Sequence, residues 1–118
     1  MSIEVTFRHM DVKDRIQAYA REQAGDLAAE FPRVEHVHVI LNYEKHEKSR
    51  MIAHVVVQAR NHIRVEAEEE SDSMRAALDD AMEKVARQLR RLRDKVQDHK
   101  AAMKHVEARR NNLSMEPT

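Results

Sequence analysis

Four basic residues in the C-terminal part of the chain recur every three or four positions. They are Lys84, Arg87, Arg91 and Lys95. On a helix this basic stripe spans a sector of about 80°, with neighbouring cations about 5–6 Å apart. Such a row suits the phosphates of a nucleic acid, and Arg adds two-pronged contacts to phosphate oxygens. Arg90 widens the positive surface. The alternative, a solvated amphipathic face, predicts mixed charges, whereas the stripe itself contains no acid.

The distribution of charge supports a basic binding element on an acidic body. The whole chain carries 21 Lys or Arg and 21 Asp or Glu. Residues 84–110 hold ten of the basic residues against three acids, whereas residues 1–83 hold eleven against seventeen. Such asymmetry is typical of a chain with an anionic partner. Aromatic residues make up only 3% of the chain, so contacts to phosphates and to the shape of a folded RNA fit better than base stacking.

Eight histidines raise the alternative of a metal site. His36 and His38 share a strand face and His54 is expected on the next strand, so three imidazoles could hold zinc. No carboxylate is clearly placed to support them, and exposed strands often carry histidine. Without cysteine and with a single glycine, the chain lacks a thiol nucleophile and a glycine-rich phosphate loop. We therefore expect no catalytic residue, metal ligand, cofactor or small-molecule substrate.

The sequence shows neither a membrane segment nor an export signal. No apolar run approaches the ~20 residues that a spanning helix needs. The first residues have no basic segment followed by an apolar one, the pattern of a secretory signal. We expect a cytoplasmic protein without a membrane partner.

Apolar periodicity predicts the elements that position these residues. Alternation predicts strands over residues 3–8, 34–43, 51–59 and 63–67, and helical spacing predicts helices over 12–31 and from 74 to about 110. Asp11 is expected to cap the first helix, and Ser71, Asp72 or Ser73 the second. The acidic run 68–70 is expected to suit the positive end of the second helix. Residues 111–118 are expected to fray.

The resulting order, β-α-β-β-β-α, predicts an α+β two-layer sandwich. A helical crossover makes the first two strands parallel, and the remaining strands follow as an antiparallel meander, giving a four-stranded mixed sheet. Each helix has one apolar face, so both should lie on the same face of the sheet. We expect a binding domain over residues 1–100 and a C-terminal helical extension with a flexible tail over 101–118.

At this level of detail the chain resembles the ribosome hibernation-promoting factor family, also known as ribosome-associated inhibitors or subunit-interface proteins. The resemblance runs from about Ile3 to Lys95. Three stretches carry it: residues 37–41 (VHVIL), 67–79 (AEEESDSMRAALD) and 84–91 (KVARQLRR), the last close to the family's Lys-x-x-Arg-Gln-Leu signature. One departure is Arg75, where the family often has an aromatic residue.

The resemblance implies a fold similar to a double-stranded RNA-binding domain. It also implies binding to rRNA, and to ribosomal proteins, of the small ribosomal subunit between head and body. There the family covers the positions of mRNA and tRNA anticodons and silences or preserves idle ribosomes. The family's basic helix positions match the basic stripe. Its basic residue after the first strand matches Arg8, and Lys13 and Arg21 match by location.

Two further expectations follow. Because the sequence ends at Thr118, we expect the short form, without the dimerisation domain of the long members. An alternative function is a protein-interaction module of the transcription-factor modulator type, in which the last helix or the open face of the sheet binds a protein.

Overall fold

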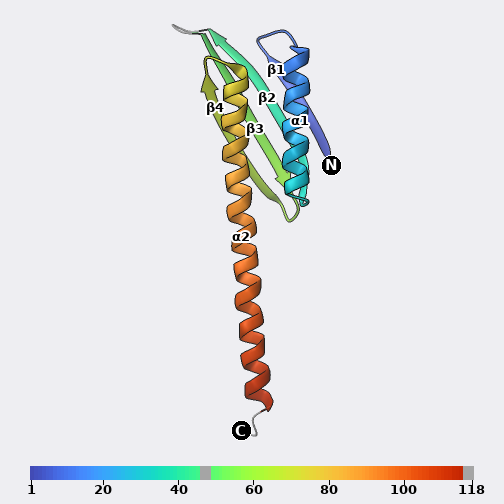
Figure 1. Cartoon of the computed structure of the whole chain (residues 1–118), viewed down its shortest axis with the longest axis vertical. Helices are drawn as coiled ribbons and strands as arrows, with labels where there is room; N and C mark the ends of the chain where they lie inside the picture. The colour runs from blue at the N-terminus through green and yellow to red at the C-terminus, as the bar shows by residue number, and fades with distance from the viewer. Residues whose placement is uncertain (46–48, 116–118) are drawn as a thin grey trace. The chain divides into compact units, whose positions relative to one another are not determined.

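The computed structural model describes the backbone of residues 1–45 and 49–115, and the side chains of residues 1–45 and 50–95. Six elements follow in the expected order (Figure 1): β1 (Ser2–Arg8), α1 (Asp14–Glu30), β2 (Val34–Lys45), β3 (Ser49–Ala59), β4 (Ile63–Ser71) and α2 (Met74–Met115). The chain forms two compact units, Met1–Gln88 and Leu89–Thr118. The sheet, α1 and the first part of α2 belong to the first unit. Residues 116–118 of the expected tail lie outside the described residues.

The sheet has the mixed topology that the element order predicts. Its strands lie in the order β1-β2-β3-β4. β1 pairs with β2 in parallel, with Val5 opposite Val39, because α1 carries the chain back between them. β3 pairs antiparallel with both β2 and β4. The predicted α+β fold with a four-stranded mixed sheet is therefore confirmed.

Apolar side chains between one face of the sheet and the helices form the core. The largest fully buried side chains are Leu41, Leu78, Val37, Val39, Val55, Val57 and Val85. α1 adds Ala20, Ala24 and Leu27, and within the first unit both helices lie on the same face of the sheet (Figure 1). Burial of each Val or Leu side chain contributes about 1.5–3 kcal/mol, so this layer dominates the stability of the unit.

The start of α1 differs from the expected cap. The helix begins at Asp14, after Lys13, which makes no side-chain capping hydrogen bond. The expectation of a cap at Asp11 is wrong because the position before the helix is Lys13. Between β1 and the helix, His9 takes a left-handed conformation with a φ of 57°. Val12, the first residue of the range predicted for this helix, is 56% exposed. Asp14 instead places a negative charge in the first turn.

The start of α2 and the turn between β3 and β4 agree with the residue types at these positions. The Ala76 N–H donates to Ser73 Oγ at 3.4 Å, which selects Ser73 among the three candidate caps of α2. Asn61, in the turn between β3 and β4, has a φ of 67°, and His62 follows with 60°. Asn and His are both enriched among the non-glycine residues that adopt this conformation, so the residue types at both positions are compatible with it.

The acidic run lies in a strand and not at the helix end. β4 continues to Ser71, so the expectation that residues 68–70 serve the dipole of α2 is wrong. Strand alternation sends Glu69 toward α2, and Glu68 and Glu70 to the opposite face of the sheet.

Candidate nucleic-acid interface

Lys84 and Arg87, the stripe residues within Met1–Gln88, are exposed on α2 and carry ion pairs. The Lys84 ammonium group contacts the carboxylate of Glu69 on β4, with the two side chains 55% and 22% exposed. Arg87 Nη2 donates to Glu83 Oε1 at 2.7 Å, one turn earlier on the helix. The expectation of a stripe without acids is therefore incomplete, because these carboxylates come from a flanking helix position and a neighbouring strand.

These ion pairs leave both cations available to an anionic partner. An exposed pair such as Arg87–Glu83 contributes only about 0–1 kcal/mol, because water screens the charges and two long side chains lose freedom. The Lys84–Glu69 pair is exposed at Lys84 and half-buried at Glu69. A phosphate that replaces the carboxylate has to break only this weak ion pair, and it forms charge-assisted hydrogen bonds with the cation. A phosphate at this surface would therefore compete with Glu69 for Lys84 and with Glu83 for Arg87.

Arg90, Arg91 and Lys95 belong to the second unit, Leu89–Thr118. Their side chains are exposed, and α2 runs through all three positions without a break. The helical conformation on which the prediction of the stripe depends is therefore present. Arg93 Nε lies 3.9 Å from Asp94 Oδ1, a distance too long for a hydrogen bond.

Arg8 lies apart from Lys84 and Arg87. It ends β1 on the face of the sheet opposite the helices, where Thr6 Oγ1 and His38 Nε2 lie 2.9 Å apart. β1 and β4 form opposite edges of the sheet, whereas Lys84 contacts β4. The fold therefore separates Arg8 from the first-unit part of the stripe.

The two candidates on and before α1 are both exposed. Lys13 is the last residue before the helix and Arg21 lies within it. Neither is held in the apolar layer, so both cations can reach a partner from the α1 side of the unit.

The histidines contact carboxylates that the sequence argument did not place. Glu4 on β1 lies 3.8 Å from His36 Nε2 and 3.9 Å from His38 Nε2. On β3, His54 Nε2 lies 2.9 Å from Glu66 Oε2 on β4. Among the residues whose side chains are described, no three His, Cys, Asp or Glu side chains are arranged to hold a metal ion.

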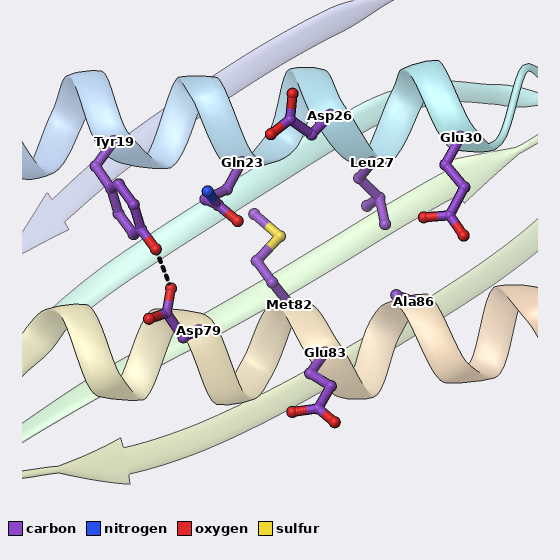
Figure 2. Close-up of a pocket in the computed structure, with 9 residues that line it drawn as sticks. All are labelled: Tyr19, Gln23, Asp26, Leu27, Glu30, Asp79, Met82, Glu83 and Ala86. Atoms are coloured by element: carbon purple, nitrogen blue, oxygen red, sulfur yellow. Dashed lines mark hydrogen bonds between the residues drawn. The ribbon is translucent and has the colours of Figure 1, made fainter.

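A groove runs between α1 and α2 (Figure 2). It has a volume of about 380 Å³ and is lined by Tyr19, Gln23, Asp26, Leu27, Glu30, Asp79, Met82, Glu83 and Ala86. At one end the Tyr19 hydroxyl donates to Asp79 Oδ1, and the Arg75 guanidinium carbon lies 4.3 Å from the centroid of the Tyr19 ring. The hydrogen bond to Asp79, aided by burial, raises the pKa of Tyr19, and Arg75 opposes the shift.

Sequence reasoning missed these contacts for different reasons. The pair Glu83–Arg87 has the i,i+4 spacing of a helical ion pair, so it could have been predicted from the sequence. The contacts Lys84–Glu69 and Tyr19–Asp79 join separate elements, so the sequence carries no local signal for them.

No helix in the described part of the chain is long and apolar enough to cross a membrane.

A sequence model of the family described as "Sigma 54 modulation protein / S30EA ribosomal protein" matches residues 3–97. The chain belongs to this family. The match covers the stretch over which the sequence resembles hibernation factors, so that prediction is confirmed.

Curated relatives in the family are bacterial and are named ribosome hibernation promoting factor. The protein of Salmonella typhimurium is 28% identical over 102 residues, 84% of this chain and 100% of that protein. The protein of Escherichia coli K12 is 28% identical over 100 residues, again 84% and 100%. The protein of Acidithiobacillus ferridurans is 35% identical over 63 residues, 53% of this chain and 81% of that protein. Membership of this family supports a ribosome-associated hibernation role.

Two solved structures share the fold. A ribosomal subunit interface protein from Coxiella burnetii superposes with a TM-score of 0.69 at 19% identity, covering 80% of this chain and 99% of that one. The N-terminal domain of Protein Y from Thermus thermophilus gives 0.66 at 22% identity, covering 78% and 99%. At these identities the likeness concerns the fold alone, and it agrees with the predicted architecture.

Proposed function

We propose that this protein binds the small ribosomal subunit at the region that holds mRNA and tRNA anticodons, and so silences or preserves idle ribosomes. The observation that carries the proposal is the exposure of four cations in helical segments, Lys84 and Arg87 within Met1–Gln88 and Arg91 and Lys95 within Leu89–Thr118, in a chain of this family. The mechanism is occupancy: the cations neutralise rRNA phosphates, counterions leave, and the domain fills space that mRNA and tRNA need.

The surroundings of the aromatic residues favour phosphate readout over base stacking. Phe31 is 5% exposed, and Arg75 covers one face of the Tyr19 ring. Phe7 and Tyr43 are only partly exposed. Recognition of splayed bases requires open aromatic faces, so contacts from Arg and Lys to a folded RNA backbone fit this surface better. Arg90, Arg8, Lys13 and Arg21 are the additional cations that we assign to rRNA contacts.

The test is co-sedimentation with purified small subunits at low and high salt. The protein should migrate with the subunit at low salt and dissociate at high salt. A variant with Lys84, Arg87, Arg91 and Lys95 all changed to Glu should lose binding while keeping its circular dichroism spectrum. A matched control reverses four exposed cations elsewhere: Arg33, Lys45, Arg60 and Arg64.

Each outcome has a distinct meaning. Loss of binding in the stripe variant alone supports the basic stripe as the rRNA surface. Equal loss in both variants would mean that total charge, and not this face, drives association. Absence of co-migration at every salt concentration would overturn the proposal in favour of a protein-interaction module that uses the last helix or the open face of the sheet.

A further inference from the structure

We propose that the helix of the second unit pairs with an acidic amphipathic helix of another protein, as one strand of a two-stranded coiled coil. The contact would be made along the C-terminal seam, defined as Leu92, Val96, His99, Met103, Val106, Arg110 and Leu113. This inference goes beyond the proposed function and does not depend on it.

The second unit, Leu89–Thr118, is helical from its first residue to Met115. The family match ends at residue 97, so the helix continues beyond the part of the chain that the family model covers. Within its described residues this unit has neither a strand nor a second helix. Helices in proteins owe most of their stability to the packing of an apolar face. An apolar face on this helix therefore has to be covered from outside the unit.

The residues of the C-terminal seam recur at alternating intervals of four and three. Five of the seven positions are apolar, and His99 and Arg110 occupy the other two. This spacing, continued over three heptads, is that of positions a and d in a coiled coil. A polar residue at such a position lowers stability but specifies the register and the partner.

The composition of the segment also favours a helix over a lipid surface as the partner. Residues 92–113 contain no Trp, Tyr or Phe, whereas helices that lie in a membrane interface commonly insert aromatic and leucine side chains. A row of phosphates would need the cations of this helix but would leave its apolar seam uncovered. Another amphipathic helix satisfies both features.

The positions that flank the seam are predominantly basic. These e and g positions are Arg93, Lys95, Lys100, Ala102, Glu107 and Arg109, and charges there determine the choice of partner. In a parallel pair of two copies, Lys95 would face Lys100 of the other copy. In an antiparallel pair, Lys95 would face Arg109. Because both arrangements place like charges together, the flanks select a partner with Glu or Asp at these positions and not a second copy of this chain.

A synthetic acidic helix tests the inference on the full-length protein. The probe is a fluorescein-labelled peptide of four heptads with Ile and Leu at the seam and Glu at both flanking positions. It should bind wild type, whereas the same peptide with Lys at the flanking positions should not. Lys100→Glu/Arg109→Glu should weaken binding at least about fivefold, because two flanking charges become repulsive. The matched control, Arg91→Glu/Lys104→Glu, makes the same change in net charge outside the seam and its flanks and should stay within about twofold of wild type.

Three results would overturn the proposal. Equal weakening in the two charge variants would mean that net charge, and not the seam, attracts the peptide. Unchanged binding in Met103→Glu/Val106→Glu would mean that the seam makes no contact. A wild-type dimer in sedimentation equilibrium at micromolar concentration would make a second copy the occupant. All of these substitutions lie outside Met1–Gln88, so the first unit should keep its fold in every variant.

A photo-crosslink reads the partner in the cell. Benzoylphenylalanine incorporated in place of Ala102, at a flanking position, should give an adduct with a protein segment that carries acidic residues beside an apolar heptad repeat. An adduct with rRNA or with a second copy, or none, would overturn the inference. If the protein fails to sediment with small subunits, the proposed function fails, and the peptide titration still decides this inference by itself.

Discussion

Lys84 on α2 forms an ion pair with Glu69 on β4, and Gln88, one turn further along the helix, donates through Nε2 to the backbone carbonyl of Glu66 at 3.0 Å. Two side chains four residues apart thus attach the first part of α2 to the edge strand of the sheet. Lys84 is also one of the cations that we assign to rRNA contacts, so a substitution of Lys84 should change both the stability of the fold and the affinity for RNA.

The Lys84–Glu69 pair predicts that removing the carboxylate strengthens RNA binding. In Glu69→Gln, Lys84 no longer has to leave an anion to meet a phosphate. Affinity for the small subunit should rise by about fivefold, which corresponds to a contribution of about 1 kcal/mol from a pair that is exposed at Lys84 and half-buried at Glu69. Glu68→Gln is the matched control, since its side chain points to the opposite face of the sheet. Sedimentation binding curves measure both, and weaker binding in Glu69→Gln would show that Glu69 orients Lys84 instead of competing for it.

The Gln88 hydrogen bond predicts a loss of stability that leaves the charge unchanged. Gln88→Met keeps the length of the side chain and removes the donor to the Glu66 carbonyl. The free energy of unfolding should fall by about 0.5–1.5 kcal/mol, the usual contribution of one such bond. Urea unfolding followed by circular dichroism measures the change. An unchanged midpoint would mean that water replaces the side chain at this carbonyl without loss.

The elements were predictable because apolar alternation identifies strands and the side chains that face the core, and the strand pairing followed from the helical crossover and the meander. Leu41 and Val55 follow a period of two and are buried as expected. The start of α1 was predicted wrongly, because Asp11 is of a favoured capping type, whereas the helix begins three residues later at Asp14. At the candidate site, the positions of Lys84 and Arg87 followed from helical spacing. Their partners did not, since Glu69 reaches Lys84 through the packing of a strand against a helix.

Leu78 and Val12 test the core as the structure defines it. Both are apolar residues within the predicted helix ranges, yet Leu78 is 0% exposed and Val12 is 56% exposed. Leu78→Ala should lower the free energy of unfolding by about 2–5 kcal/mol through lost burial and the cavity left behind. Val12→Ala should change it by less than about 0.5 kcal/mol. A large effect at Val12, measured by the same urea titration, would place the start of α1 nearer to Asp11.

The Tyr19–Asp79 hydrogen bond predicts a loss of stability at high pH. The folded protein holds the Tyr19 proton more tightly than the unfolded chain, because ionisation removes the donated hydrogen bond and adds a charge beside Asp79. The raised pKa of Tyr19 stabilises the folded protein by its full amount below pH 10.0, the usual pKa of tyrosine. This stabilisation is lost as the pH rises through the pKa that Tyr19 has in the folded protein. Above pH 10, stability should therefore fall more steeply in wild type than in Tyr19→Phe. Parallel curves would show that the bond persists in the unfolded chain or is absent in solution.

The salt dependence of binding should report how many stripe cations contact phosphate. The logarithm of the affinity falls linearly with the logarithm of the salt concentration, by roughly 0.7–0.9 for each phosphate neutralised. Lys84→Ala/Arg87→Ala and Arg91→Ala/Lys95→Ala should each reduce the slope by about 1.4–1.8, because the first pair probes Met1–Gln88 and the second probes Leu89–Thr118. Lys45→Ala/Arg60→Ala, which removes two exposed cations outside the stripe, should leave the slope unchanged. If only the Lys84/Arg87 variant changed the slope, the rRNA surface would end within the first unit, and the cations beyond Gln88 would need another role.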